Sequence, residues 1–502
     1  MDAKTLAYTF DEEAFGFGEP VTPEGVAPPD TLGLKGAEKL GLALVGLGTL
    51  SLLVQSFGGP FAGTWPGFLS AFGLLAGGGA LAFWGRWKDT HAGIKHDGTW
   101  FQGLLARGGA GWIAGILMTG FYVLLYWFPE VLGHPSDGGE PTGLVRVVDP
   151  LARVLTGYPA SQWFLYGVLY TLSIAVFGVR MLMKYRHNRY HQIRTLSVSF
   201  FQTAFAWFLP NLLVYFREPY MEFNGVWPLK YDYLWPSKIG EFQNAGGLGV
   251  FLMFWALMAA LVATPVLTYL YGKRWYCSWV CGCGGLAETL GDPWRQLSDK
   301  STRAWKIERW LIHSVLVLVL ATTAVVWADH TWGWFGSWSG PLKQWYGFYI
   351  GAVFSGVVGV GFYPLFGNRV WCRFGCPQAA ILGLLQRFFS RFRITTNGGQ
   401  CMSCGNCSTY CEMGIDVRAY AQRGENIVRA SCVGCGVCAA VCPRGVLRLE
   451  NGDPKDRFDG SDVPLKAFVD SFQEPQIYGY EPWPKTGACA EVAGSREGTP
   501  GA

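Results

Sequence analysis

Fourteen cysteines dominate the chemistry available to this 502-residue chain, and eight of them form two closely spaced runs. The first run reads CMSCGNCSTYC from Cys401 to Cys411, and the second reads CVGCGVCAAVC from Cys432 to Cys442. Both have the spacing Cys-x2-Cys-x2-Cys-x3-Cys, in which three thiolates surround one 4Fe-4S cluster and the fourth binds the neighbouring cluster. The spacing therefore predicts two 4Fe-4S clusters.

The same rule predicts which cysteines share a cluster, because the fourth cysteine of each run crosses to the other site. Glycines inside the runs suit tight loops, since glycine adopts backbone angles that other residues avoid. Glu412 stands where proline is usual, and a carboxylate there could lower the potential of a nearby cluster. Zinc also binds Cys-x2-Cys pairs, but two four-cysteine runs are a poor zinc pattern. The predicted ligand sets are Cys401, Cys404, Cys407 and Cys442 for one cluster, and Cys432, Cys435, Cys438 and Cys411 for the other.

Five further cysteines occur upstream, in two segments that resemble each other. KRWYCSWVCGCGGLAETL and NRVWCRFGCPQAAILGLL both place a basic residue, an aromatic residue and Cys-x3-Cys at the end of an apolar segment. This similarity indicates a duplicated unit whose thiols could converge. Three interpretations stay open: a third iron-sulfur cluster, a redox-active thiol set, or small buried residues at helix ends. The cysteines are Cys277, Cys281, Cys283, Cys372 and Cys376.

The composition indicates a membrane protein. Half of the residues are hydrophobic and 15% are charged, whereas soluble domains carry about 25% charged residues. Several apolar segments approach the length of about 20 residues that crosses a bilayer. The net charge of +4 is small and does not indicate nucleic-acid binding. The eight predicted spans are 40–57, 65–84, 112–128, 163–183, 196–215, 248–271, 310–327 and 346–366.

The distribution of Lys and Arg predicts the orientation of these spans. With the N-terminus inside, the inner loops are richer in Lys and Arg than the outer loops, as the positive-inside rule requires. Both termini and the cysteine-rich domain are therefore predicted to be cytoplasmic, in a multi-pass protein of the bacterial inner membrane. A reducing compartment also suits so many free thiols.

The predicted fold is mainly α: a polytopic transmembrane helical bundle of about eight spans, with a small α+β ferredoxin-like domain that holds two 4Fe-4S clusters. An amphipathic helix from Ala379 to Phe392 is expected on the inner membrane surface, where it would tie the cluster domain to the bundle. The predicted parts are a flexible acidic N-terminal tail (1–38), a bundle of five spans (39–247), three spans with the Cys-x3-Cys units and the surface helix (248–393), the two-cluster domain (394–450) and a polar C-terminal tail (451–502).

Polar residues in or next to the predicted spans are considered as sites for a quinol and for haem. Asp329 and His330 follow Trp327 at the outer end of the seventh span, where a carboxylate and an imidazole could take protons from a quinol. An interfacial aromatic belt with ordinary loop charges is the simpler interpretation. His313 alone falls clearly within a span and has no intramembrane histidine partner, so haem is not expected.

The two Cys-x3-Cys units followed by two ferredoxin runs resemble the membrane polyferredoxin family that includes NapH and the C-terminal half of NosR. Cys372, Cys376 and Pro377 match its Cys-x3-Cys-Pro motif, whereas Gly282 replaces the proline that would follow Cys281. The likeness extends from the sixth span to Leu449, roughly two fifths of the chain. CcoG-type proteins, which are linked to oxidase assembly and copper reduction, share a Cys-Pro-Gln sequence and are a more distant match.

The resemblance implies an integral membrane iron-sulfur protein that relays electrons between the quinone pool and a partner redox enzyme or subunit. A quinol dehydrogenase-type component is one form of this function. Flavin is not implied, because the Ser-Gly-Ala-Thr attachment motif of NosR does not occur in the sequence. The alternatives are an assembly factor that reduces a metal or thiols during maturation of another complex, and a membrane anchor and relay subunit of an oxidoreductase.

Overall fold

The computed structural model describes residues 36–88, 109–135, 138–396 and 401–452. Most of both predicted tails, together with Cys489 and the loop histidines His91 and His96, lies outside the described residues. All described residues fall within one compact unit.

Six helices of the described chain are long and apolar enough to cross a membrane, which indicates a polytopic membrane protein. They coincide with the first, second, fourth, fifth, sixth and seventh predicted spans. Several contain wide π-helical turns, over Leu69–Gly73, Phe201–Phe208 and Ala259–Ala263. The six are α1 (Gly36–Ser56), Trp65–Trp87 with α2 (Trp65–Phe68) and α3 (Leu74–Trp87), α9 (Gln162–Lys184), Arg189–Tyr215 with α10 (Arg189–Phe200) and α11 (Leu209–Tyr215), Gly246–Tyr271 with α13 (Gly246–Met258) and α14 (Thr264–Tyr271), and α17 (Thr302–Trp332).

The other two predicted spans differ from these six. The third corresponds to α5 (Gly109–Trp127), whose apolar part is shorter. The eighth is interrupted, because α18 (Ser339–Trp345) continues into π-helical turns over Tyr346–Val358 and the helix then ends before α19 (Tyr363–Phe366). Glycines favour this interruption, and the proline in α19 lacks the amide that would continue a helix.

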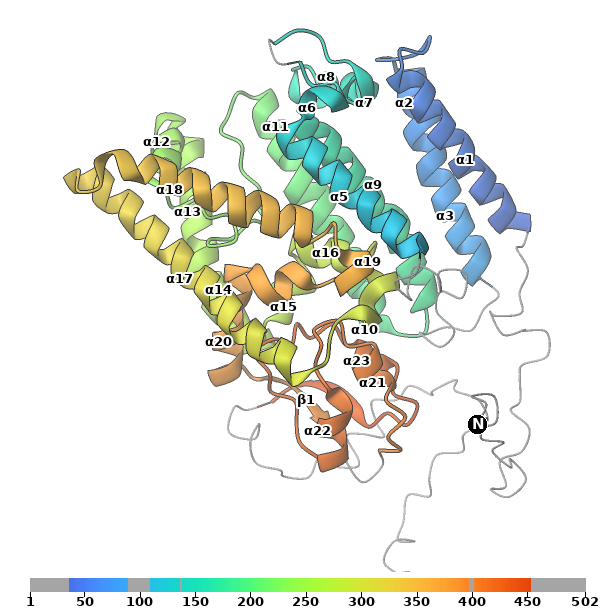
Figure 1. Cartoon of the computed structure of the whole chain (residues 1–502), viewed down its shortest axis with the longest axis vertical. Coiled ribbons are helices and arrows are strands. Elements are labelled where there is room, and N and C mark those ends of the chain that lie inside the picture. Colours follow the sequence, from blue (N-terminus) through green and yellow to red (C-terminus); the bar gives the residue numbers. More distant parts are fainter. Residues whose placement is uncertain (1–35, 89–108, 136–137, 397–400, 453–502) are drawn as a thin grey trace, which may run out of the picture. The chain divides into compact units, whose positions relative to one another are not determined.

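The first two spans pack against each other along their length (Figure 1). A Cβ atom on Gly41 would lie 2.4 Å from the backbone nitrogen of Ala82, and one on Gly78 would lie 2.8 Å from the carbonyl oxygen of Gly41. The absence of side chains at these positions lets the two backbones approach closely. Small residues at such contacts are usual where membrane helices pack closely.

Short helices connect the spans. Two of them, α15 and α16, follow the sixth span and carry the first upstream cysteines, and a π-helical turn over Trp371–Gly375 carries Cys372. Two 3-10 segments cover Asp292–Leu297 and Gly336–Trp338. The short helices are α6 (Pro129–Leu132), α7 (Gly143–Val147), α8 (Asp149–Thr156), α12 (Pro236–Asn244), α15 (Arg274–Cys277) and α16 (Gly282–Glu288).

The ferredoxin-like domain is closed by a two-stranded antiparallel sheet. Strand β1 (Phe392–Thr396) pairs with β2 (Leu447–Asn451), so that Phe392 lies opposite Asn451 and Thr396 opposite Leu447. The sheet joins the two ends of the domain, and the cysteine runs lie between them in sequence. Three short helices complete the domain, namely α21 (Asn406–Thr409), α22 (Val417–Arg423) and α23 (Val437–Ala440).

The predicted surface helix is shorter and more buried than expected. It forms α20 (Pro377–Phe388), and Phe392 begins β1 instead of ending the helix. α20 packs against α14 and α17 and buries Gln386. This polar side chain is accommodated because its Nε2 donates to the carbonyl oxygens of Arg429 and Cys432 at 2.9 and 2.8 Å. The helix therefore joins the bundle to a cysteine loop through an internal face, as its predicted tying role requires, and its position at the membrane surface stays a prediction.

Candidate iron-sulfur centres

The two cysteine runs fold in the same way. In each run a glycine in the left-handed conformation precedes a one-turn helix: Gly405, with φ of 80°, precedes α21, and Gly436, with φ of 83°, precedes α23. A side chain would strain both positions. The repeated conformation follows from the repeated sequence, and it bends each run around its own loop.

The last cysteine of each run accepts a hydrogen bond from the backbone four residues later. The amide of Ile415 donates to Cys411 Sγ at 3.4 Å, and the amide of Val446 donates to Cys442 Sγ at 3.3 Å. Such N–H···S bonds stabilise negative charge on sulfur and raise the potential of a cluster bound there. They form because the chain turns back directly after each run.

The eight thiols line two separate cavities of the described structure, four in each. Each cavity takes three cysteines from one run and the last cysteine from the other, which is the grouping that the crossing rule predicts. One cavity is lined by Cys401, Cys404, Cys407 and Cys442, and the other by Cys411, Cys432, Cys435 and Cys438.

Burial makes these thiols poor acids without a cation. It raises the pKa of Cys407 and of Cys432 to about 11, and that of Cys438 well above its usual value. Thiolates in such a site need a bound metal to compensate their charge. The thirteen cysteines that the structure describes are all free thiols, so none of these ligands is consumed by a disulfide.

The structure also brings together the five upstream cysteines. The pKa of Cys277 is raised to about 12, mainly by burial, and nearby Cys281 and Cys372 contribute to the increase. Cys283 lies within hydrogen-bonding reach of Cys281, lowering the Cys281 pKa to about 7. The charges of Cys372 and Cys376 in turn contribute to a raised pKa of Cys283. The two similar segments therefore converge on one set of thiols, four of which are at least nine tenths buried.

The backbone around this set is tightly packed. A Cβ atom on Gly284 would lie 2.0 Å from the carbonyl oxygen of Cys277, so the glycine after Cys283 lets α16 lie directly against the first cysteine. Cys376 caps α20, where its Sγ accepts a hydrogen bond from the amide of Ala379 at 3.4 Å. Each similar segment thus contributes cysteines at the start of a helix.

The spacing of the sulfur atoms distinguishes a single ion from a cluster. Tetrahedral zinc with Zn–S bonds of about 2.3 Å requires sulfur atoms about 3.8 Å apart. No three cysteines in the described part of the chain lie within 4.8 Å of one another, either in the ferredoxin runs or upstream. Ligands of a polynuclear cluster bind different iron atoms and stand further apart, so this absence is compatible with cluster binding.

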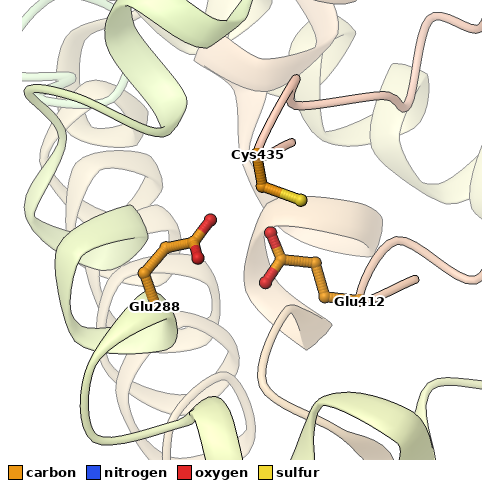
Figure 2. A group of neighbouring side chains, drawn as sticks. All are labelled: Glu288, Glu412 and Cys435. Carbon is orange, nitrogen blue, oxygen red and sulfur yellow. The ribbon is translucent and has the colours of Figure 1, made fainter. Parts of the chain in front are cut away.

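One mixed group does lie within that distance, formed by Glu288, Glu412 and Cys435. Figure 2 shows the two carboxylates facing each other, with the Cys435 sulfur directed toward Glu412. Guanidinium groups neutralise these carboxylates. Arg369 Nη2 lies 2.6 Å from Glu288 and 2.9 Å from Glu412, and Arg295 Nη1 lies 3.1 Å from Glu412. Buried ion pairs therefore occupy the position that a metal ion would need.

The two carboxylates differ in acidity. Burial raises the pKa of Glu288, but Arg194, Arg295 and Arg369 outweigh burial and hold the Glu288 pKa well below its usual range. Burial also raises the pKa of Glu412, and its neighbour Glu288 adds to that increase. Glu288 is thus the firmly ionised member of the pair.

The upstream cysteines contact the second ferredoxin run through this network. Arg369 Nη1 lies 3.2 Å from the carbonyl oxygen of Cys277 and 3.6 Å from Cys372 Sγ, while its Nη2 reaches Glu412. Ser278 Oγ donates to the carbonyl oxygen of Val433 at 2.8 Å. Arg369 and Ser278 therefore join the two cysteine groups within one buried region.

The buried charges were not identified from the sequence, and Arg295 is an example of them. It is 0% exposed and lies 2.9 Å from Asp292, which also binds Arg180 and Lys184. The available signal was the close spacing of Glu288, Asp292 and Arg295 directly after a cysteine motif, because charges beside apolar segments are usually paired.

Asp329 and His330 lie in the last turn of α17. The Asp329 carboxylate accepts hydrogen bonds from Ser339 Oγ and from the amide of Gly336, which closes the loop after α17. His330 is exposed and lies edge-on to Trp327, with ring centres 6.1 Å apart. A quinol site at these residues stays a prediction.

Comparison with known proteins assigns the same segments. A family model described as a 4Fe-4S dicluster domain matches residues 400–447, and one described as a 4Fe-4S binding domain matches 253–302 and 349–395. The first covers both ferredoxin runs, and the second covers both upstream cysteine segments. This chain contains 4Fe-4S-binding domains of the ferredoxin type.

Curated relatives cover part of the chain. YccM of Escherichia coli (strain K12), named as an electron transport protein, is 29% identical over 174 residues, which are 32% of this chain and 47% of YccM. The methylamine utilization ferredoxin-type protein MauN of Paracoccus denitrificans is 29% identical over 180 residues, 34% of this chain and 60% of MauN. MauN of Methylobacillus flagellatus is 26% identical over 166 residues, 30% of this chain and 54% of that protein. The chain thus spans about half the length of the curated relatives it matches. No solved structure gives a significant match.

Proposed function

We propose that this protein relays electrons between the quinone pool of the bacterial inner membrane and a partner redox protein. The observation that carries the proposal is the grouping of thirteen free cysteines into two four-cysteine cavities and one adjoining set at the ends of membrane helices. Similarity to YccM and to the ferredoxin-type MauN proteins supports a role in electron transport.

Two 4Fe-4S clusters would be held by the four-cysteine sets that line the two cavities. A third iron-sulfur centre would be held by four of the five upstream cysteines. Cys277, Cys281, Cys372 and Cys376 are the more buried members, which leaves Cys283 as a hydrogen-bonding neighbour of Cys281. We infer that the domain with the two clusters is cytoplasmic, because the Lys and Arg distribution favours that orientation.

The clusters would supply reversible one-electron chemistry, and the chain's own residues would adjust it. The amides of Ile415 and Val446 donate to ligand sulfurs and favour added negative charge. Arg369 and Arg295 place positive charge next to Glu412, which lies beside Cys435. Burial in the bundle excludes water from the upstream thiols and protects a centre there from hydrolysis and oxidation.

Quinol-dependent reduction of the purified protein in liposomes tests the function. Anaerobic addition of ubiquinol or menaquinol is expected to bleach the visible absorbance of the clusters, and dithionite serves as the positive control. If dithionite reduces the clusters and neither quinol does so, the quinone part of the proposal is wrong.

A second candidate is thiol-based reduction of a metal or a thiol in a partner complex. One observation favours it: the pKa of Cys281 is lowered to about 7, first by the hydrogen bond from Cys283, which would make it a reactive thiolate. Iron content separates the two functions, because a third 4Fe-4S cluster adds about four irons per chain, whereas a thiol reductant leaves the count at about eight.

A further inference from the structure

A cavity of about 570 Å³ lies between α17, α20 and the loops of the ferredoxin-like domain. Its volume is within the range of about 300–1,000 Å³ that is usual for small-molecule sites. α17 contributes His313 to its wall, α20 contributes Leu384 and Phe388, and the π-helical turn before α20 contributes Cys372 and Arg373.

Arg373 lines this cavity and carries one buried donor without a partner. The side chain is 3% exposed, its Nε binds Glu308 at 2.7 Å, and its Nη1 donates to the carbonyl oxygen of Asp299 at 2.6 Å. Its Nη2 has no hydrogen-bond partner among the described residues. A buried donor without a partner is costly, and a small movement of this side chain toward the cavity would let a ligand oxygen satisfy it.

His313 offers an acceptor in a fixed tautomer. Its Nδ1 lies 2.6 Å from the carbonyl oxygen of Arg309. Because a carbonyl oxygen only accepts, Nδ1 must carry the proton, and Nε2 of the neutral ring is then an acceptor. The cavity wall therefore combines one hydrogen-bond donor with one proton acceptor.

The same cavity reaches the candidate redox centres. Cys372 belongs to the upstream thiol set and lines the cavity directly, while Ser431 lines it next to Cys432 and Met413 lines it two residues after Cys411. A ligand there would contact one candidate ligand of the third centre and the loops that hold the second cluster. Electrons could pass from such a ligand without a further carrier.

The rim of the cavity is apolar and open. Leu384 and Phe388 line it and are 38% and 66% exposed. Trp310 and Leu311, on the adjoining turn of α17, are 80% and 38% exposed. These side chains belong to helices at the predicted edge of the membrane, so an apolar molecule could enter from the lipid.

We propose that this cavity binds the ring of a hydroquinone and is the site where it exchanges electrons with the iron-sulfur centres. The inference rests on the proposed function and places its quinone site on the side of the ferredoxin-like domain. Arg373 Nη2 donates to one ring oxygen, and His313 Nε2 accepts the proton of the other hydroxyl.

The reaction balances with the centres named above. Both O–H bonds of the hydroquinone break, one proton passes to His313 Nε2 and the other to water at the mouth of the cavity. The two electrons of the ring would be accepted, one each, by two 4Fe-4S clusters held by the cysteine sets described above. The product is the quinone, and the reverse reaction uses the same groups. Protons are exchanged on the side that holds the cluster domain.

An anionic lipid headgroup is a less suitable occupant, although several cations line the cavity. Lys273 Nζ donates to the carbonyl oxygen of Ala430 at 3.3 Å, Arg387 donates to that of Val428, and Arg429 donates to Tyr420 at 3.1 Å. These cations hold the walls of the cavity together. Arg309, another cation of the lining, lies over the Trp305 ring, 5.2 Å from its centroid. A neutral ring with two oxygens fits the buried donor of Arg373 and the acceptor of His313 better.

The test uses the full-length, cluster-loaded protein in phosphatidylcholine vesicles, with decylubiquinol as the probe. His313→Gln is expected to slow quinol-dependent cluster reduction about a hundredfold, because it removes a proton acceptor. Leu384→Trp narrows the cavity without removing a charge and is expected to raise KM severalfold. Ser314→Ala, next to His313 but outside the cavity lining, is the matched control and should retain the wild-type rate. Dithionite should reduce all variants equally.

The outcomes separate the site from the function. If decylubiquinol reduces the wild type and His313→Gln at the same rate, the site is wrong while the proposed function stands. If His330→Gln slows the reaction instead, the site lies at the opposite end of α17 and the inference is overturned. If the quinol-dependent reduction of the wild type requires phosphatidylglycerol and that of Leu384→Trp does not, the cavity is a lipid site. This result would also overturn the inference. If dithionite alone reduces the wild type, the proposed function itself fails.

Discussion

Arg369 binds Glu412 with its Nη2 2.9 Å from the carboxylate, and both residues are almost fully buried. Arg369 belongs to the segment before the second upstream cysteine motif, whereas Glu412 directly follows the last cysteine of the first ferredoxin run. One ion pair thus joins the membrane bundle to a cluster loop. It also modifies the expectation that Glu412 lowers a cluster potential, because the guanidinium compensates its charge.

Replacement of Arg369 should make the second cluster harder to reduce. Arg369→Gln removes a positive charge beside Glu288 and Glu412, which disfavours the additional electron and leaves buried carboxylates unpaired. A potentiometric titration followed by EPR is expected to show a more negative potential. Loss of one partner of a buried pair also costs about 3–5 kcal/mol of stability, which thermal unfolding would register.

The double variant Arg369→Gln, Glu412→Gln provides the control for that prediction. Removing the carboxylate together with its partner should return the potential toward the wild-type value and recover part of the lost stability. An unchanged potential in the single variant would show that Arg369 does not act on the cluster.

Asp292 is expected to stabilise the folded chain at neutral pH. Burial raises its pKa, but Lys184, Arg180 and Arg295 outweigh burial and hold the Asp292 pKa well below its ordinary value of 3.8. The stabilisation is therefore fully present above pH 3.8 and is lost as pH falls through the lower folded pKa. Asp292→Asn should be less stable than wild type at every pH above about 4, with a constant difference.

Unfolding of both proteins between pH 8 and pH 4 provides the measurement for Asp292. A difference in stability that disappears near pH 6 would contradict the depressed pKa. The exposed carboxylate Glu140 offers a matched variant, Glu140→Gln, which is expected to change stability by less than about 0.5 kcal/mol.

Close packing of the first two spans should depend on Gly41. Gly41→Leu would drive a side chain into the backbone of Ala82. It is expected to lower the free energy of unfolding by about 3 kcal/mol, the upper end of the usual cost of overpacking. Gly46→Leu is the matched control on the same helix, because a Cβ atom there would have no neighbour within 4 Å. Equal melting temperatures for the two variants in detergent would contradict the packing of α1 on α3.

Single cysteine variants should remove whole centres selectively. Cys407→Ser is expected to release the cluster of the first cavity, about four irons per chain, and Cys438→Ser that of the second. EPR spectra of the two variants should then be complementary. Identical spectra would contradict the assignment of four cysteines to each cavity.

Local features were accessible from the sequence, and long-range ones were not. The ferredoxin runs and the left-handed Gly405 and Gly436 depend on spacing within a few residues, so the sequence analysis could anticipate them. The ion pair between Arg180 and Asp292 joins residues 112 positions apart, and no local pattern indicates it. The internal face of α20 was missed for a similar reason, because Gln386 is buried only through its bonds to a distant loop.

The prediction of membrane spans also succeeded for local features and failed for one that depends on more than hydropathy. Length and hydropathy identified six helices that the structure also describes as apolar enough to cross a membrane. The eighth predicted span failed as one continuous helix because hydropathy does not register that Gly359 and Pro364 interrupt it. The convergence of Cys277 with Cys372 was anticipated from the similarity of their two segments, since duplicated units often pack as a pair.

The most direct test of the central claim is the iron content of the anaerobically purified protein, measured together with its zinc content and its EPR spectrum. Two ferredoxin clusters and a third centre of the same kind predict about twelve irons per chain and no stoichiometric zinc. About eight irons would remove the third centre while retaining the other two. Zinc in place of iron, with no EPR signal after reduction, would contradict the electron-relay account as a whole.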